Sequence, residues 1–553
     1  MATIVTKTRT ILALAIAVIV LGIMLRLLGF FSIEVWVDES TWGRRAWLGQ
    51  YGWLRPIGFM WLEKQIIGLY SSEQTLRLLS YVAGIAQLPL VWIALRRVTS
   101  SPWAALTGLF LLAVNPIAVA MTKEFKPYAL ESMLHTALAL LAFWYVAKPS
   151  SVRAAVVVAT TALLPLVSWS VVFAYPAVYG VVGLSALRGR RRADVAVVVV
   201  GVIVTFAVLG VLAYMRIRGH NVASEKWGER YDVFPDVGIE VGAAAWWYLE
   251  KTAEIAALPG RIDVVWPVWP RLSPVTQGIG AALVVTGIVG SVVRTRWMVL
   301  ALFFSAWPIA LAFNLARHWP YGVFRTNTFL VFTTCALAAI GVDVVIALLA
   351  RRMAASPPVW RRAAIALAVS LAVYAFPWRI DHFAHKLKGT LTTEQGVLRA
   401  MRRLRELEGE APPSAKRLLL LDGRACRNYR YYTEVHDGTR TELAAWFAER
   451  FDVTCGHYRS EEIWRALVET KRGQSFWAII ITKTMATTMK KVLGPQCTGP
   501  TLDQKFRGHT SIYRCDVPGS SPTAAIGNDA PANDDEAGDD APGDDEAPDQ
   551  PEP

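Results

Sequence analysis

LALAIAVIVLGIMLRLLGF, residues 12–30, is an apolar run whose single charge is Arg26. About 20 apolar residues in an α-helix are enough to cross the hydrocarbon core of a bilayer. Similar or slightly shorter runs follow at residues 76–95, 103–120, 129–147, 195–215, 278–293, 297–316, 329–349 and 363–376. This repetition predicts a polytopic α-helical membrane protein.

A longer apolar region, residues 154–187, exceeds the length of one span. Arg153 precedes it, and RGRRR, residues 188–192, follows it. Basic residues mark the cytoplasmic ends of membrane helices, so their presence at both ends predicts a two-helix hairpin that turns near residues 168–170. With this hairpin, the chain has about 11 predicted membrane helices.

The composition agrees with membrane insertion. Of 553 residues, 54% are hydrophobic and 18% are charged, whereas about a quarter of the residues of a soluble domain are charged. The net charge is +13, and residues 518–553 carry 11 acidic and no basic residues, so the rest of the chain has a net charge of +24. The basic residues form short clusters between apolar runs, as topology signals do, so we expect membrane lipids and no nucleic acid as partners.

The basic clusters also predict the orientation. They all fall on one side of the predicted spans: Lys7 with Arg9, Arg96 with Arg97, Lys148 with Arg153, residues 188–192, Arg294 with Arg296, and residues 351–362. The positive-inside rule makes this side cytoplasmic, which places the N-terminus inside and the region after the last span outside in a multi-pass protein of the cell membrane. TKTRT, residues 6–10, with the run after it is also compatible with a cleaved signal peptide, but the length of the run favours an uncleaved helix.

The chain divides into three predicted parts. Residues 1–378 contain the spans, residues 379–517 have the composition of a globular domain, and residues 518–553 form an acidic tail with a composition typical of disorder. In the middle part, helix-like and strand-like stretches alternate, with helices at 392–410 and 441–451 and strands at 417–423 and 475–482. This alternation predicts a small extracytoplasmic α/β domain.

Four of the five cysteines lie in this domain, at Cys426, Cys455, Cys497 and Cys515. An extracytoplasmic location would allow two disulfide bonds, whose connectivity the sequence leaves open. Zinc binding is the alternative, but no CxxC spacing occurs. The imidazoles nearby are those of His436, His457 and His509.

The first candidate catalytic residues follow directly after the first apolar run, in EVWVDESTWGRRAW, residues 34–47. Asp38 and Glu39 are adjacent carboxylates on the aqueous side of a membrane boundary, close enough to the lipid surface to meet a lipid-borne substrate. The second outward loop lies in NPIAVAMTKEFKPYAL, residues 115–130, and has more charges than a tight turn needs. Its polar residues are Lys123, Glu124, Lys126 and Tyr128.

These motifs resemble the C-type glycosyltransferases with the GT-C fold, of the protein O-mannosyltransferase and aminoarabinose-transferase kind (glycosyltransferase family 39). The resemblance covers roughly residues 10–340. It rests on Asp-Glu at 38–39, Arg-Pro-Ile at 55–57, SEQTLRLLSYVAGI at 72–85, Asn-Pro and then E-x-K-P-Y within 115–128, and WPYGVFRTNTFLVF at 319–332.

The resemblance implies a membrane glycosyltransferase that moves a hexosyl or pentosyl group from a polyprenyl-phosphate donor to an extracytoplasmic lipid, glycan or protein. It implies Asp38 as the general base, with Glu39 orienting it, binding the acceptor or holding a metal. A divalent cation stays open as a cofactor, since an Asp-Glu pair acts with or without one.

A departing phosphate needs fixed cations. The resemblance implies Arg55, Lys126 and Arg325 for this role, with Glu124, Tyr128 and Tyr321 in support. Lys126 replaces the arginine usual in the family, so bidentate phosphate recognition is lost at that position.

Plainer interpretations compete with these roles. Asp38 and Glu39 also fit solvated residues at the end of a helix, Glu124 and Lys126 an ion pair that closes a turn, and His318 and Arg325 interfacial anchors. Glu131 and His135 lie four residues apart near the outer end of a span, where an interhelical pair is favoured over a metal or sugar ligand.

A polytopic transporter or lipid flippase is the main alternative from another class. A membrane scaffold whose outer domain binds a partner is a second one. Transporters commonly carry charges at mid-helix and have broken helices in corresponding halves of an internal repeat. Here the strongest charges gather at one predicted membrane face, which favours the glycosyltransferase.

Overall fold

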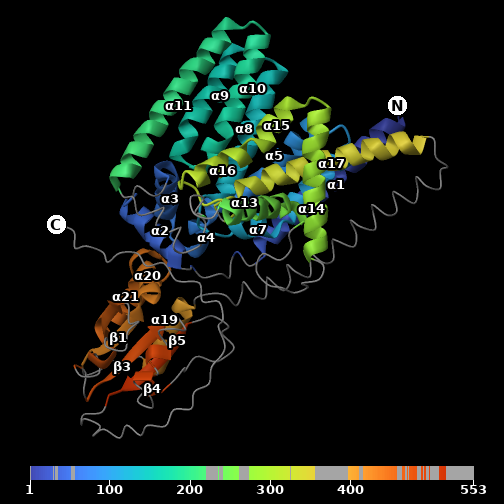
Figure 1. Cartoon of the computed structure of the whole chain (residues 1–553). Coiled ribbons are helices and arrows are strands. Elements are labelled where there is room, and N and C mark those ends of the chain that lie inside the picture. The colour runs from blue at the N-terminus through green and yellow to red at the C-terminus, as the bar shows by residue number, and fades with distance from the viewer. Residues whose placement is uncertain are drawn as a thin grey trace.

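The computed structural model of the chain is a helix bundle with a smaller sheet-containing domain at one end (Figure 1). The structure describes residues 2–28, 30, 35, 37–51, 56–219, 235, 241–260, 273–323, 326–354, 396–409, 415–456, 464–466, 470, 473–481, 487–489, 491–492, 497–498 and 510–517.

The prediction of a polytopic helical protein is confirmed. Seven helices of the described ranges are long and apolar enough to cross a membrane, and there are nine if each of two bent helix pairs is one span. The long helices are α1 (Ala2–Leu27), α5 (Leu78–Val98), α8 (Tyr128–Ala147), α11 (Arg192–Gly219), α14 (Ser273–Val293) and α17 (Phe329–Ala354), with Ser170–Arg188 ending in α10 (Tyr175–Arg188).

Two predicted spans are bent. Helix α6 (Pro102–Ala113) meets α7 (Pro116–Thr122) at 53°, and α15 (Trp297–Phe304) meets α16 (Ala306–Leu315) at 42°. At the first bend, the Asn115 side chain accepts hydrogen bonds from the first backbone N–H groups of α7, and Pro116 occupies the first helical turn. A cap followed by proline starts a new helix, so the chain changes direction there.

The predicted hairpin is also present. Helix α9 (Ser151–Leu163) and α10 are joined by 3₁₀ turns at Leu164–Leu166 and Ser170–Ala174. Helix α9 is too short to be counted among the seven candidate spans and is a shorter apolar helix beside them. The predicted total of 11 spans is not confirmed, and the last predicted span, residues 363–376, lies outside the described residues.

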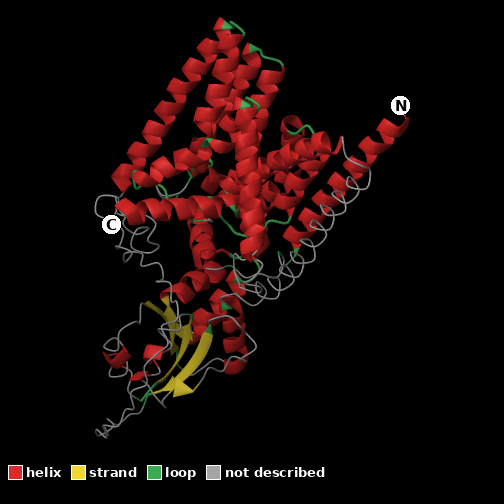
Figure 2. Ribbon diagram, turned by 45° about the vertical axis from the view of Figure 1, so that its right-hand side comes forward, coloured by secondary structure: helices red, strands yellow, loops and turns green. Residues whose placement is uncertain are grey.

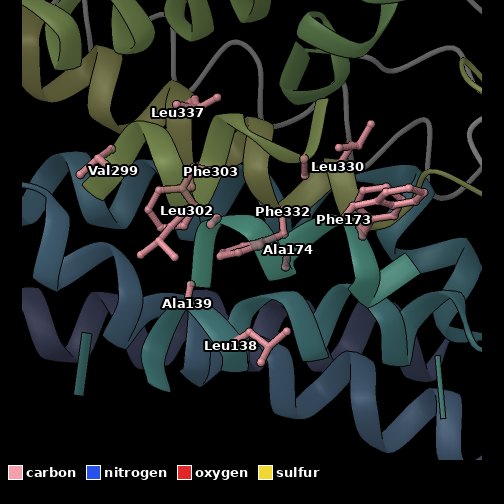
Figure 3. Close-up of a cluster of buried hydrophobic side chains, with 14 of the residues drawn as sticks. Leu138, Ala139, Phe173, Ala174, Val299, Leu302, Phe303, Leu330, Phe332 and Leu337 are labelled. Carbon is pink, nitrogen blue, oxygen red and sulfur yellow. The ribbon is translucent and has the colours of Figure 1, made fainter. Parts of the chain in front are cut away.

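Small residues let the helices of the bundle approach closely. A Cβ atom on Gly287 of α14 would lie 2.0 Å from the Leu337 carbonyl oxygen, and one on Gly341 of α17 would lie 2.0 Å from the Leu283 carbonyl oxygen. Such contacts are typical of helix pairs in membranes. Around them, side chains of α8, α15 and α17 form the main apolar cluster (Figure 3).

Three short helices lie at the end of the bundle that faces the smaller domain (Figure 1). They are α2 (Val37–Leu48), α3 (Ile57–Leu69) and α4 (Glu73–Leu76). A further helix, α13 (Val241–Ala256), precedes α14. Helix α3 begins within the Arg-Pro-Ile motif of residues 55–57, and its Phe59, Met60 and Ile67 are buried while Trp61 is half exposed.

The C-terminal domain is the predicted small α/β unit (Figure 2). Its described residues form five strands, β1 (Arg417–Asp422), β2 (Phe451–Gly456), β3 (Ser475–Ile480), β4 (Cys497–Thr498) and β5 (Ser511–Asp516), in the order β2-β1-β3-β5-β4. Strands β2, β1 and β3 are parallel, while β5 is antiparallel to β3 and β4. The helices are α19 (Val397–Glu408), α20 (Gly423–Arg430) and α21 (Arg440–Arg450), with a π-helical turn at Tyr431–Val435.

The cysteines support the predicted disulfide bonds. Cys426 of α20 is bonded to Cys455 of β2, with their Cα atoms 5.6 Å apart. Cys515 of β5 is also disulfide-bonded, and Cys497 is its Cα partner in the register of β4 and β5. The bond between Cys426 and Cys455 fixes α20 to the edge of the sheet.

Candidate functional site

The adjacent carboxylates Asp38 and Glu39 occupy the first turn of α2. Acidic side chains are favourable there because the N-terminus of a helix carries partial positive charge. Successive helix residues point about 100° apart, so the two carboxylates face different surroundings. The Asp38 side chain is 23% exposed, whereas that of Glu39 is 1% exposed.

Glu39 is held on both carboxylate oxygens by Arg77. The Arg77 Nε donates to Oε1 at 2.9 Å and Nη2 donates to Oε2 at 2.5 Å. The backbone N–H of Phe125 also donates to Oε1, at 2.7 Å. Glu39 therefore joins the first turn of α2 to the start of α5 and to the turn between α7 and α8.

Arg77 is a site residue that the sequence analysis missed. It follows α4, whose first turn is capped by the Ser72 hydroxyl, and it precedes the apolar helix α5. Its side chain is 1% exposed, and the carboxylate of Glu39 raises its pKa despite the burial that opposes ionisation. The signal was visible in SEQTLRLLSYVAGI as one arginine at the start of the apolar run of residues 76–95.

Asp38 faces Lys126. The Lys126 Nζ lies 3.7 Å from Asp38 Oδ2 and 3.9 Å from the centre of the Trp42 ring. Trp42 is one helical turn after Asp38, so the ammonium group is held between an anion and an aromatic face of the same helix. On the backbone, the Lys126 carbonyl accepts a hydrogen bond from the Ser80 hydroxyl at 2.6 Å. The structure thus brings two of the predicted site residues together.

An aromatic cluster supports this pair from one side. The rings of Trp42, Phe59 and Phe125 pack with centroid distances of 5.8–6.4 Å. Phe59 and Phe125 are fully buried. Because the three rings come from α2, α3 and the turn before α8, they fix these segments relative to one another.

The other predicted site residues fall into two groups. Arg55 and Arg325 lie outside the described residues, so their roles stay predictions. Glu124 and Tyr128 flank Lys126 and are half-buried. Tyr321 is buried, and its hydroxyl lies 3.1 Å from that of Thr252 in α13. Their supporting roles likewise stay predictions.

The residues considered for metal binding are placed as follows. In the described ranges, no group of three or more His, Cys, Asp or Glu side chains is arranged to hold a metal ion. His135 Nε2 lies 3.0 Å from the Ser170 carbonyl oxygen, and its ring stacks on that of Phe329. Glu131 is buried one helical turn before His135, in the first turn of α8. The His135 side chain thus links α8 to the turn before α10.

Fold and site together describe a polytopic helical protein with a carboxylate–ammonium pair where short helices join the bundle. No protein-family profile and no curated protein matches the chain. Its structure is similar to the crystal structure of ArnT from Cupriavidus metallidurans bound to undecaprenyl phosphate, with 14% identity, 92% of this chain and 98% of that chain covered, and a TM-score of 0.48.

The apo state of the same ArnT is similar as well, with 13% identity, 93% of this chain and 98% of that chain covered, and a TM-score of 0.46. ArnT is an aminoarabinose transferase with the GT-C fold, which is the kind of enzyme that the sequence motifs resemble. With TM-scores below 0.5, this likeness assigns no role to any residue described above.

Proposed function

We propose that this protein is a membrane glycosyltransferase that moves one sugar from a polyprenyl-phosphate donor to an extracytoplasmic acceptor. The single observation that carries the proposal is the placement of Lys126 Nζ 3.7 Å from the carboxylate of Asp38. A base for the acceptor and a cation for the leaving phosphate are the two groups that such a transfer needs. A carboxylate and an ammonium group suited to these two roles lie together beside the ends of the membrane helices.

The proposed reaction uses Asp38 as the base. The acceptor hydroxyl gives its proton to the Asp38 carboxylate while its oxygen bonds to C1 of the sugar. The bond between C1 and the phosphate oxygen breaks, and its electron pair leaves with the polyprenyl phosphate. Negative charge therefore moves from Asp38 to the phosphate, and the ammonium of Lys126 is close enough to stay paired throughout.

Glu39 has a different proposed role. Of the three roles that the resemblance implies, its burial against Arg77 favours orientation over contact with the acceptor or a metal. Its contact with the Phe125 N–H fixes the turn that holds Lys126. Glu39 and Arg77 therefore set the distance between the base and the cation.

The positions of the buried charges favour an enzyme over a transporter. Arg26 lies in the last turn of α1, Glu131 in the first turn of α8 and Asp194 in the first turn of α11. Asp343 forms ion pairs with Arg294 and Arg296, next to the turn between α14 and α15. Transporter sites typically lie near the bilayer midplane, whereas these described charges lie at helix ends or pair with residues there.

The function is tested with membranes that contain the protein and a panel of labelled polyprenyl-phosphate pentoses and hexoses. Release of polyprenyl phosphate together with a labelled acceptor product is the expected result. Mass spectrometry of envelope glycans from cells with and without the protein identifies the sugar and the acceptor. Transport of the intact donor lipid without cleavage would contradict the proposal and favour the flippase.

Changes at Lys126 test the phosphate role. We expect Lys126→Gln to lower transfer about a hundredfold, as the loss of one preorganised electrostatic contact to a developing anion does. Lys126→Arg keeps the charge and adds bidentate geometry, so it should retain transfer within about tenfold of the natural protein. Initial rates against donor concentration provide the measurement. Equal rates for the Gln and Arg variants would contradict a phosphate contact.

The proposed orientation places the N-terminus in the cytoplasm and the C-terminal domain outside. The disulfide bond of Cys426 with Cys455 supports an oxidising location for this domain. We expect a reporter that is active only outside the cytoplasm to be active when fused after residue 517. A fusion within the turn between α10 and α11, next to Arg190, should be inactive and is the control. The reverse pattern would contradict the orientation.

A further inference from the structure

The C-terminal domain contacts the chain on both sides of Asp38. Asn428 of α20 accepts a hydrogen bond from the Ser40 hydroxyl at 2.6 Å, and its amide nitrogen donates to the Val35 carbonyl oxygen at 3.2 Å. Val35 comes before Asp38 in the chain and Ser40 comes after it. One buried side chain, almost 400 residues away in the sequence, thus bridges the first turn of the helix that carries Asp38.

Further contacts reinforce this bridge. The Tyr432 hydroxyl accepts from the Val35 N–H at 3.3 Å, so both backbone groups of Val35 bond to the C-terminal domain. One turn along α2, Arg44 Nε lies 2.5 Å from the carboxylate of Glu434. Val35, Ser40 and Asn428 are all buried. Their hydrogen bonds have little competition from water, which raises the cost of losing any one of them.

Helix α2 packs closely against both domains at Gly43. A Cβ atom on Gly43 would lie 2.8 Å from the Leu76 side chain and 3.3 Å from the Tyr431 ring. Leu76 belongs to α4, and Tyr431 belongs to the π-helical turn of the C-terminal domain. Helix α2 is therefore held between the two domains.

The C-terminal domain is also attached to the segment that supplies Arg77. Ser71 and Asp437 exchange two hydrogen bonds, from Asp437 N to Ser71 O at 2.9 Å and from Ser71 N to Asp437 Oδ2 at 2.8 Å. Next to them, His436 Nε2 lies 2.8 Å from Glu73 Oε2. Burial opposes ionisation of Glu73, but its hydrogen bond and charge interaction with His436 prevail and lower its pKa. The C-terminal domain thus contacts both the segment that carries Asp38 and the segment that carries Arg77.

Asn428 itself stands on a rigid support. Asp422 at the end of β1 caps α20, since its Oδ1 accepts from the Ala425 N–H at 2.6 Å. Its Oδ2 accepts from the Ile481 N–H, also at 2.6 Å. Two residues before Asn428, Cys426 is bonded to Cys455. Helix α20 is therefore attached to β1, to β2 and to the end of β3. A residue that positions a functional side chain needs such rigid support.

We propose that Asn428 is a positioning residue for Asp38, and that the C-terminal domain completes the site by holding the first turn of α2. The effect on sugar transfer rests on the function proposed above, whereas the effect on α2 itself does not. Misplacing a reacting group by about 1 Å costs about a hundredfold in rate. Loosening both ends of the turn that carries Asp38 should therefore lower turnover.

Hydrogen exchange of the full-length protein in lipid nanodiscs tests the positioning directly. We expect Asn428→Ala and Ser40→Ala to speed amide exchange in α2 at least fivefold or so, because their bridge keeps this turn from opening. The double variant should exchange no faster than the faster single variant, since both changes remove one shared bond. Unchanged exchange of α2 in Asn428→Ala would overturn the proposal.

Ile480→Ala is the matched control. Ile480 is buried on β3 in a cluster with Leu420, Phe476 and Tyr513, while its neighbour Ile479 belongs to the cluster that reaches α2. Alternate residues of a strand lie on opposite faces of the sheet. The control therefore destabilises the C-terminal domain from the face away from α2. We expect it to leave α2 exchange as it is in the natural protein.

Turnover provides the second readout. With a donor that the natural protein uses, we expect kcat to fall about tenfold or more in Asn428→Ala. Ile480→Ala should keep the natural kcat per folded molecule. Asn428→Ala with loosened α2 and full turnover would refute a positioning role in catalysis. If the natural protein turns over no donor, the proposed function fails, while the exchange experiment still decides whether Asn428 holds α2.

Discussion

Asp38→Asn should reduce sugar transfer at least about a hundredfold without unfolding the protein. A positioned general base contributes about 10²–10⁴ in rate, and an amide of the same shape cannot take up the proton of the acceptor. Asp38 is partly exposed, and its contact with Lys126 is a 3.7 Å ion pair, so the change should hardly alter the apparent melting temperature. Transfer from the donor found in the labelled panel is the measurement.

The control for this change is Asp452→Asn. Asp452 is an exposed aspartate on β2, on the strand that bonds to α20 through Cys455. It has the same chemistry but no place in the site, so its variant should transfer sugar at the natural rate. A folded Asp38→Asn variant with full activity would exclude Asp38 as the base. The ion pair between Asp38 and Lys126 would then have a role other than proton transfer.

Arg77→Met should have the largest effect on stability. Both side chains of the pair between Arg77 and Glu39 are 1% exposed, and removing one partner of a buried ion pair costs about 3–5 kcal/mol because the other charge stays buried without compensation. Glu39→Gln should destabilise the protein for the same reason. The apparent melting temperature of the purified protein in nanodiscs, together with its folded yield, measures the effect.

A double variant separates burial of the charge from loss of packing. Combining Glu39→Gln with Arg77→Met removes both charges, so the double variant should be more stable than the sum of the single effects predicts. Arg403→Met is the control, because Arg403 forms an exposed pair with Glu406 whose contribution is about 0.5 kcal/mol or less. Equal losses in Arg77→Met and Arg403→Met would contradict a buried pair.

Most of the helical fold could be predicted from local sequence. Whether a segment crosses a bilayer depends on its own length and polarity, so the apolar runs correspond to helices throughout the described bundle. The hairpin of α9 and α10 could be predicted from its basic flanks for the same reason. The bend at Asn115 was visible only as an Asn-Pro pair inside a continuous run, because a helix cap and an ordinary loop residue look alike in sequence.

The C-terminal domain could be predicted only in outline. The two helices and two strands named from sequence are α19, α21, β1 and β3. Helix α20 was missed because GRACRNYR is short and polar, and its start depends on the cap from Asp422. Sheet order was not predictable, since β5 pairs with β3 through contacts distant in the sequence.

By itself, the sequence determined that the chain is a multi-spanning helical protein and that its Asp-Glu pair follows the first span, because hydropathy and adjacency are local properties. Only the tertiary structure decided that the two carboxylates differ in burial and in their ion-pair partners. Helical geometry turns Asp38 toward Lys126 and Glu39 into the interior, where Arg77 meets it. It also brought Asn428 to the helix that carries them. These contacts join residues that are far apart in the sequence, so they depend on how the helices and domains pack and cannot be recognised from any one local segment.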